Sequence, residues 1–449
     1  MYFFMQLYST KNPEVLFSLK EAVLKGLPDD NGLFVPNNIS ALPASFFERL
    51  PELAFPELAY EVAKHLFEGS IPEPDLKEII TKSINFPAPL IKLNEQTSVL
   101  ELFHGPSLAF KDFGARFMAQ LMGYFNKGEE KDLIILVATS GDTGGAVAAG
   151  FHNTPGIKVV TLYPSGRVSP LQEKQLTTLG GNISAIEIEG SFDDCQALVK
   201  KAFLDKSLTE NIRLSSANSI NIARLIPQSF YYFEAYKQLG KNTKPPVFII
   251  PSGNFGNLTA GLLAKKMGLP IAHFIAATNK NDIVPSYLSS GKYKPKPSLA
   301  TISNAMDVGA PSNFYRMVSF YMDHKAPVSL ETKTWGNMKK DISGYGFDDT
   351  TTQEAMKRGY TQFNNYVFEP HGAVGLLAWE AYLKENTNVQ GIILETAHPS
   401  KFLDVVEKVL KIKVEVPERL ARLADKKKEA TLMASDYESF KSYLEKHFY

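Results

Sequence analysis

Residues 133–150 read LIILVATSGDTGGAVAAG, an apolar run that leads into a glycine-rich turn and then into small, helix-compatible residues. The same order recurs at residues 247–263, which read VFIIPSGNFGNLTAGLL. A short apolar run without alternation is typical of a strand buried on both faces, and a helix directly after it is typical of a parallel sheet. Both stretches therefore predict strand–turn–helix units of an α/β fold.

The residues around these stretches continue the same rhythm. Between about 130 and 222, strand-like and helix-like runs alternate, as in IKVVTLYP (157–164), VSPLQEKQLTTLG (168–180) and ISAIEIEG (183–190). From about residue 223 the pattern repeats, with PIAHFIAATN (270–279) and QGIILETAHPS (390–400). Strand, helix and strand at this spacing imply a parallel sheet in each region, and the junction of two such units is a natural place for a ligand site.

The two ends of the chain show weaker patterns. Up to about residue 90, helical patterns such as EVLFSLKEAVLKG (14–26) are mixed with proline-rich turns, which predicts a small helical domain or arm. After Glu415 the chain is charged and helical in character, and we expect no chemistry there.

The overall charge and the cysteine count exclude several classes of protein. Lys plus Arg and Asp plus Glu both number 48, so nothing favours nucleic acid or an anionic membrane as a partner. Cys195 is the sole cysteine and cannot form an internal disulfide or a thiolate metal site, which indicates a reducing compartment, and we expect a cytoplasmic protein. No apolar stretch reaches the roughly 18 residues that a membrane helix needs.

Each glycine-rich turn is a candidate anion site, because backbone N–H groups converge there at the start of a helix. The alternative is that the glycines only make tight turns, but two polar turns in consecutive units favour a ligand. Neither turn matches G-x-G-x-x-G, and the sequence contains no P-loop, H-E-x-x-H or G-x-S-x-G motif. Nicotinamide enzymes, P-loop NTPases, zinc hydrolases and α/β-hydrolases therefore lose support.

Lys111 stands out in ELFHGPSLAFKDFGARF (101–117). A lysine is ordinarily a solvated surface charge. The neighbours of Lys111 are apolar, and Ser107 is placed to cap a helix that follows Pro106. A partly desolvated ammonium loses its proton more easily, and a neutral amine is what a Schiff base or a proton-abstracting base requires.

Two further groups of polar residues lie near predicted element ends. Thr396 follows the predicted strand GIILE (391–395) and should face the crevice, where a neutral hydroxyl could hydrogen-bond a pyridine nitrogen. His398 is interpreted as structural. Arg224 suits a phosphate dianion, although an arginine at such a place is commonly a salt-bridge former. Asn218 and Asn221 lie close to it in sequence.

Taken together, the motifs resemble those of threonine synthases of the bacterial and fungal type, within the fold-type-II pyridoxal-phosphate enzymes. The resemblance covers nearly the whole chain and rests on KGLPDDNGLFVP (25–36), GPSLAFKDFGARF (105–117), ATSGDTGGA (138–146), SANSINIARLIPQSFYYFEAY (216–236), PSGNFGNL (251–258), NAMDVGAPSNFYR (304–316) and ETAHPSKF (395–402). It implies a tryptophan synthase β-like α/β fold with two parallel-sheet domains and a small N-terminal domain. The implied boundaries are 1–90 for the N-terminal domain, 91–130 with 223–449 for the large cofactor-binding domain, and 131–222 for the small domain.

The resemblance also implies roles for individual residues. Lys111 would hold pyridoxal 5′-phosphate covalently and act as the catalytic base. The cofactor phosphate would lie in the turn formed by Gly253, Asn254, Phe255, Gly256 and Asn257, with Thr396 at the pyridine nitrogen and Asp142 beside the 3′ oxygen. Substrate contacts would come from Ser140, Gly141 and Thr143 for the carboxylate, and from Asn218, Asn221 and Arg224 for the phosphate. No metal is implied.

The implied activity is conversion of O-phospho-L-homoserine and water to L-threonine and phosphate. Two alternatives stay open: a phospho-lyase that releases 2-oxobutyrate and ammonia, and a non-catalytic relative that binds a phosphorylated ligand. The sequence departs from the wider pattern at Asp142, where related enzymes often have Asn, at Gly372, where many have Thr, and at Ala310, where Asn is common. The expected assembly is a monomer or a homodimer.

Overall fold

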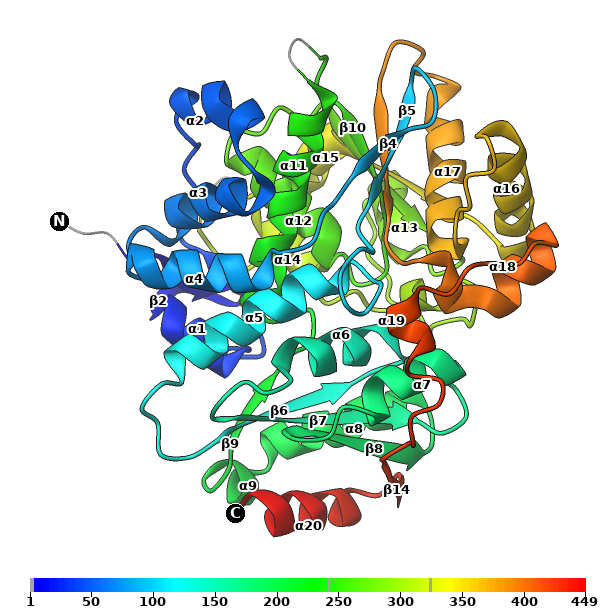
Figure 1. Cartoon of the computed structure of the whole chain (residues 1–449). Coiled ribbons are helices and arrows are strands. Elements are labelled where there is room, and N and C mark those ends of the chain that lie inside the picture. Colours follow the sequence, from blue (N-terminus) through cyan, green and yellow to red (C-terminus); the bar gives the residue numbers. More distant parts are fainter. Residues whose placement is uncertain (1–3, 241–242, 323–324) are drawn as a thin grey trace.

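The computed structural model describes residues 4–240, 243–322 and 325–449. Its largest sheet has the strand order β12-β11-β10-β13-β5-β4 (Figure 1). All neighbours in this sheet are parallel except β4, which runs antiparallel to β5. The strands are β4 (Leu90–Lys92), β5 (Thr97–Glu101), β10 (Val247–Pro251), β11 (His273–Thr278), β12 (Ile342–Gly346) and β13 (Gly391–Glu395).

Both faces of this sheet are buried, which explains its uninterrupted apolar runs. Along β10, Ile249 belongs to one hydrophobic cluster, whereas Phe248 and Ile250 belong to the other. The associated helices are α11 (Phe230–Leu239), α12 (Gly256–Lys266), α13 (Ile283–Ser290), α14 (Phe314–Ser319), α15 (Thr332–Asp341), α16 (Asp349–Gln362), α17 (Pro370–Leu383) and α18 (Leu403–Leu410). Short 3₁₀ helices cover Ile226–Ser229 (η2), Asn304–Met306 (η3) and Pro399–Phe402 (η4).

A second sheet is parallel throughout and has the order β14-β8-β7-β6-β9. Its strands are β6 (Leu133–Ala138), β7 (Ile157–Pro164), β8 (Ile183–Glu189), β9 (Arg213–Ser216) and β14 (Thr431–Ala434). The helices of this part are α6 (Asp142–Phe151), α7 (Pro170–Thr177), α8 (Phe192–Leu204), α9 (Lys206–Thr209) and α20 (Tyr437–Phe448). The short helix α10 (Ile222–Leu225) packs against α5 and η2 instead, and α19 (Glu418–Ala421) precedes β14. The predicted strands and helices between 130 and 222 are confirmed.

The end of the chain returns to this second sheet instead of staying with the first. β14 adds as an edge strand beside β8, and Phe440 and Leu444 of α20 pack into the cluster that contains Cys195 (Figure 1). The expected grouping of residues 223–449 in one unit therefore differs at its C-terminal end. β14 is mostly exposed, so it lacks the apolar run by which β6, β7 and β8 were predicted.

The N-terminal part contains more strand than the sequence predicted. It has an antiparallel sheet, β2-β1-β3, made of β1 (Gln6–Ser9), β2 (Asn12–Ser18) and β3 (Phe34–Pro36). The stretch 14–26 was predicted to be helical, but its first half is strand and only α1 (Leu19–Lys25) is helix, because Ser18 and Glu21 form a capping box at that point. The other helices are α2 (Ala44–Arg49), η1 (Leu50–Glu52), α3 (Phe55–Phe67) and α4 (Glu73–Ser83).

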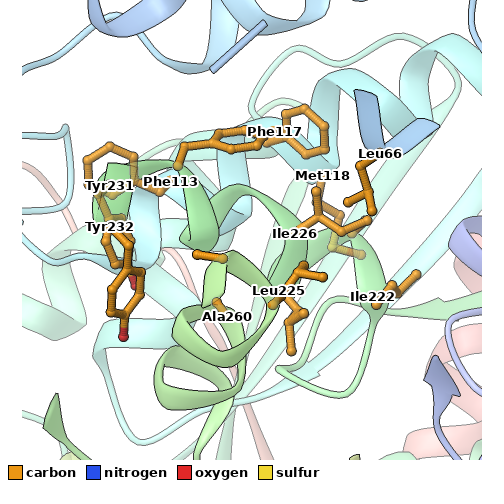
Figure 2. Close-up of a cluster of buried hydrophobic side chains, with 14 of the residues drawn as sticks. Leu66, Phe113, Phe117, Met118, Ile222, Leu225, Ile226, Tyr231, Tyr232 and Ala260 are labelled. Atoms are coloured by element: carbon orange, nitrogen blue, oxygen red, sulfur yellow. The ribbon is translucent and has the colours of Figure 1, made fainter. Parts of the chain in front are cut away.

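Helix α5 (Lys111–Phe125) packs against α6 and lies between the two larger sheets (Figure 1). Figure 2 shows that Phe113, Phe117 and Met118 of α5 lie in a buried cluster with side chains from α3, α10, η2, α11 and α12. The labelled members are Leu66, Phe113, Phe117, Met118, Ile222, Leu225, Ile226, Tyr231, Tyr232 and Ala260. This packing fixes the position of the helix whose first residue is Lys111.

Candidate active site

Lys111 is brought to the large sheet by a short antiparallel contact between two distant segments. Ala109 forms an isolated bridge with Ala397, the Phe110 N–H donates to the Thr396 carbonyl at 2.8 Å, and the His398 N–H donates to the Leu108 carbonyl at 3.0 Å. Lys111 follows directly as the first residue of α5. Two motifs almost 300 positions apart in the chain, at about 110 and about 397, therefore share one site.

The helix does not begin where the sequence suggested. Ser107 does not cap it: Phe110 occupies the N-cap position and makes no side-chain capping bond. The Ser107 N–H instead donates to Asp112 Oδ2 at 2.8 Å, so the aspartate inside the helix holds the preceding loop. Starting the helix later makes Lys111 its first residue, within reach of Asp142.

The Lys111 amine is mostly shielded from water, with 16% of its side chain exposed. Burial lowers its pKa, Asp142 raises it, Lys401 and Arg224 lower it, and Glu369 raises it, with a net lowering from the ordinary value of a lysine. Lys111 Nζ lies 3.8 Å from Asp142 Oδ2. The site thus makes the Lys111 ammonium easier to deprotonate than that of an exposed lysine, which is the direction expected from its apolar neighbours in the sequence.

The turn between β6 and α6 holds Asp142 at the start of the helix. Thr139 Oγ1 accepts from the Gly141 and Gly144 N–H groups at 3.0 and 2.8 Å, which fixes the turn. Gln172 Nε2 donates to Asp142 Oδ1 at 2.8 Å. The predicted site residues of this segment are consecutive: Ser140 and Gly141 in the turn, and Asp142 and Thr143 at the start of α6. Asp142 is the one whose contact with Lys111 is described above.

The turn between β10 and α12 leaves no room for side chains at its first glycine. A Cβ on Gly253 would lie 2.7 Å from the Ala305 carbonyl oxygen, and Phe255 has a left-handed backbone with φ 59°. Asn254 is held on both sides, since its Nδ2 donates to Ser219 Oγ and its Oδ1 accepts from the Ser312 N–H. Asn257 Oδ1 accepts from two buried tyrosine hydroxyls, at 2.7 and 2.8 Å.

Thr396 lies at the carboxyl end of β13, as predicted, and adjoins a buried acidic pair. Its hydroxyl donates to Glu369 Oε1 at 3.4 Å, and Glu369 also accepts from His371 Nδ1 at 2.6 Å. The Glu369 N–H donates to Glu395 Oε1 at 2.9 Å. Burial, together with the Glu369 carboxylate, raises the pKa of Glu395 well above its ordinary value, so the site favours the protonated carboxyl group of Glu395 over its carboxylate.

The glycine at position 372 is explained by Glu395. A Cβ on Gly372 would lie 1.6 Å from Glu395 Oε2, so the carboxyl group fills the space that a larger residue would need. We expect Gly372→Ala to lower the free energy of unfolding by about 1–3 kcal/mol, because the buried carboxyl must move. Denaturant titration of the single variant, of Glu395→Ser and of the double variant tests this. Gly372→Ala should lower the free energy of unfolding much less in the Glu395→Ser variant than in the unaltered chain. An equal decrease in both would contradict the explanation.

The three residues predicted to bind the substrate phosphate differ in whether their side chains still have hydrogen-bonding groups free for a ligand. Arg224 is buried, its Nη1 donates to the Ala217 carbonyl, and its Nε has no hydrogen-bond partner among the described residues. Burial lowers the pKa of Arg224 to about 10, so it remains a cation at neutral pH. Asn218 Oδ1 also lacks a partner in the described part of the chain. The Asn221 side chain is fully used within the protein, donating to the Val23 and Ser216 carbonyls and accepting from the Ala223 N–H.

His398 has the structural role that was expected for it. It is the N-cap of η4, where its Nδ1 accepts from the Ser400 N–H at 3.1 Å. Burial, and then the charge of Arg419, lowers the pKa of His398 to about 4. A proton on Nδ1 would remove this cap, so the folded chain keeps His398 neutral.

The stability of the protein should depend on pH through His398. A free histidine has a pKa of about 6.5, so between about pH 6.5 and pH 4 the unfolded chain binds a proton that the folded chain does not. The contribution of His398 is complete above about pH 6.5 and is lost as the pH falls toward 4. His398→Asn keeps a capping acceptor without titrating, so the unaltered chain should lose stability relative to it over this window. Unfolding titrations at several pH values measure the difference, and a constant difference would contradict the assignment.

Sequence reasoning missed several residues of the site. Lys401 Nζ lies 2.7 Å from Asp142 Oδ1, and Glu369 and Glu395 lie beside Thr396. Lys401 and Glu395 are inside the quoted motif ETAHPSKF, and Lys401 is followed by Phe402 and Leu403. The apolar-neighbour criterion that singled out Lys111 could have found Lys401 as well.

The residues present fit a phosphate-bearing aldehyde cofactor. The turn before α12 excludes a Cβ at Gly253, the buried Arg224 Nε has no partner among the described residues, and Lys111, a lysine with a lowered pKa, lies 3.8 Å from Asp142 on α6. Among the described residues there is no group of three or more His, Cys, Asp or Glu side chains that could hold a metal ion. Within the same residues, no helix has the length and apolar character needed to cross a membrane.

Comparisons with known families and proteins agree with this site. Residues 83–393 match the family described as "Pyridoxal-phosphate dependent enzyme", residues 6–84 match "Threonine synthase N terminus", and residues 372–444 match "Threonine synthase, C-terminal". The threonine synthase of Haemophilus influenzae is 45% identical over 445 residues, which cover 98% of this chain and 99% of that protein.

Solved structures show the same likeness. The crystal structure of threonine synthase from Escherichia coli is 42% identical and superposes with a TM-score of 0.88, covering 99% of this chain and 100% of that one. The PLP-bound threonine synthase from Brucella melitensis is 33% identical with a TM-score of 0.91 and covers 99% of both chains. The expected fold of two parallel sheets with a small N-terminal unit is confirmed. The chain belongs to the threonine synthases, within the family of pyridoxal-phosphate-dependent enzymes.

Proposed function

We propose that this chain converts O-phospho-L-homoserine and water to L-threonine and inorganic phosphate, with Lys111 as the residue that carries the cofactor and moves the protons. One observation carries the assignment of the site. A lysine whose pKa is lowered by its surroundings and a buried arginine whose Nε has no hydrogen-bond partner among the described residues lie on the same side of α5. Gly114 is one helical turn after Lys111, and a Cβ on Gly114 would lie 2.9 Å from Arg224 Nε. A reaction that needs both a base and a phosphate leaving group suits this pair.

In this proposal the cofactor phosphate lies in the turn Gly253–Asn257, where the first N–H groups of α12 point outward and no Cβ obstructs the backbone at Gly253. Thr396 would serve the pyridine nitrogen and Asp142 the 3′ oxygen of the cofactor. When bound, pyridoxal phosphate supplies an aldehyde that condenses with amines and a ring that takes up the charge left on a deprotonated carbon.

The chain's own residues then have distinct tasks. Lys111 Nζ would hold the cofactor and, as a neutral amine, would accept the α proton of the substrate. Arg224 and Asn218 hold the substrate phosphate and stabilise it as it leaves the γ carbon. The substrate carboxylate binds at the start of α6, to Ser140, Gly141 and Thr143. Asn221 supports Arg224 by fixing the start of α10.

The organic product decides between this function and its alternatives. Purified protein loaded with cofactor and incubated with O-phospho-L-homoserine should release phosphate and L-threonine in equal amounts. Formation of 2-oxobutyrate and ammonia in place of threonine would show a phospho-lyase. Binding of the compound without release of phosphate would show a non-catalytic relative.

The setting of the protein is part of the same proposal. We place it in the cytoplasm as a monomer or homodimer with no nucleic acid partner. The support is the equal number of acidic and basic residues and the single cysteine, Cys195, which is buried in the cluster under α20. Burial raises the pKa of this thiol to about 12, so it is unreactive.

A further inference from the structure

Lys401 is a second lysine of the site, and it is more deeply buried than Lys111. Only 1% of its side chain is exposed. It lies on η4 (Pro399–Phe402), which three residues separate from the end of strand β13 at Glu395. An ammonium group in such a place is costly unless all of its protons are bonded and its charge is compensated.

Three acceptors satisfy the Lys401 ammonium. Its Nζ lies 2.7 Å from Asp142 Oδ1, 2.8 Å from the Ser107 carbonyl oxygen and 3.1 Å from Gln175 Oε1. An ammonium has three protons, so none is left over. Asp142 and Gln175 belong to α6 and α7, so Lys401 also joins η4 to the helices of the second sheet.

The Asp142 carboxylate contacts both lysines, but it lies closer to Lys401 than to Lys111. Its Oδ1 is 2.7 Å from Lys401 Nζ and accepts from Gln172, whereas its Oδ2 is 3.8 Å from Lys111 Nζ. Only the first contact is a hydrogen-bonded ion pair. Burial raises the pKa of Asp142, but Lys401 and then Lys111 outweigh this and hold it well below its ordinary value.

We propose that Lys401 is the permanent counter-ion of Asp142, so that Lys111 is released from pairing with that carboxylate and its amine stays available as a neutral nucleophile and base. Lys401 is therefore a positioning residue that acts through Asp142. The inference rests on the proposed role of Lys111 as nucleophile and base.

The charged groups that face Lys111 set the direction of the effect. They are Asp142 on α6, Arg224 on α10, Glu369 before α17 and Lys401 on η4. Without Lys401, Lys111 would be the nearest cation to the buried Asp142 carboxylate. Losing the Lys111 proton would then leave that charge uncompensated, so the amine should hold its proton to a higher pH.

Reductive methylation of the full-length chain, freed of cofactor, measures this directly. Formaldehyde with cyanoborohydride labels neutral amines, and the peptide containing Lys111 is quantified by mass spectrometry across a pH series. In Lys401→Met the labelling midpoint of Lys111 should rise by about one pH unit or more. Lys237→Met, which removes a lysine with 14% of its side chain exposed and a partner of its own in Glu234, should leave the midpoint unchanged.

The same substitution in an Asp142→Asn background shows whether Lys401 acts through Asp142. There Lys401 has no carboxylate to neutralise, so its removal should shift the Lys111 midpoint by less than half as much. An unchanged midpoint in Lys401→Met would overturn the proposal, and so would equal shifts in the two backgrounds. If Lys401→Met alone does not fold, the variant with both Lys401→Met and Asp142→Asn is compared with Asp142→Asn. A difference of about one pH unit between their Lys111 labelling midpoints would overturn the proposal. Labelling needs neither substrate nor turnover, so this result is independent of the product assay.

Discussion

Lys111→Ala should lower the rate of threonine formation by roughly 10⁴-fold or more and leave the fold intact. Turnover is lost because this amine is both the attachment point of the cofactor and the proposed base. The fold is kept because Lys111 makes one ion-pair contact, at 3.8 Å, and Asp142 retains Lys401 as its partner. Threonine and phosphate are assayed with O-phospho-L-homoserine, and the thermal midpoint of unfolding is measured on the same samples.

Lys237→Ala is a matched control for the loss of a largely buried lysine. Lys237 is exposed to a similar degree, pairs with Glu234 at 2.6 Å and donates to the Leu53 carbonyl, away from the site. We expect the opposite pattern in this variant: a lower unfolding midpoint and turnover within about threefold of the unaltered chain. Near-normal turnover in Lys111→Ala would end the assignment of this residue.

Arg224→Ala should lower kcat/KM for O-phospho-L-homoserine by roughly 10²-fold or more, with much less effect on cofactor retention. The guanidinium is buried and its Nε is unpartnered in the described part of the chain, so a phosphate dianion would gain a desolvated, charge-assisted bond. The charge of Arg224 also lowers the pKa of Lys111, so each variant is compared at the plateau of its own pH profile.

Arg116→Ala provides the comparison for Arg224. Arg116 is a residue of α5 itself, and its guanidinium donates to the Ser83 and Lys82 carbonyls at the end of α4, away from the site. Its removal should lower stability without a large change in kcat/KM. Cofactor content is read from absorbance after dialysis of each variant. Loss of cofactor from Arg224→Ala, with normal use of substrate by the fraction that stays loaded, would show that the two phosphate sites were assigned the wrong way round.

The parallel sheets were predictable because their strands are buried on both faces. Uninterrupted apolar runs such as 133–138 and 247–251 can be recognised in the sequence, and the helix that follows each gives the crossover to the next parallel strand. β2 and β14 have exposed faces and were not predicted, since an edge strand without an apolar run has no such signal. The start of α5 was misplaced because the group that holds the preceding loop, Asp112, lies inside the helix.

For the site, the sequence by itself determined the lysine, the two glycine-rich turns and the threonine at the end of a strand. Each of these has a local signature in its neighbours, and the family resemblance gave them roles. Only the tertiary structure decided how they combine. The pairing of segment 108–110 with 396–398 brings Thr396 to Lys111, and η4 brings Lys401 onto Asp142. The pKa of a buried ionisable group depends on the groups around it in space, and these come from distant parts of the chain that no local sequence pattern connects.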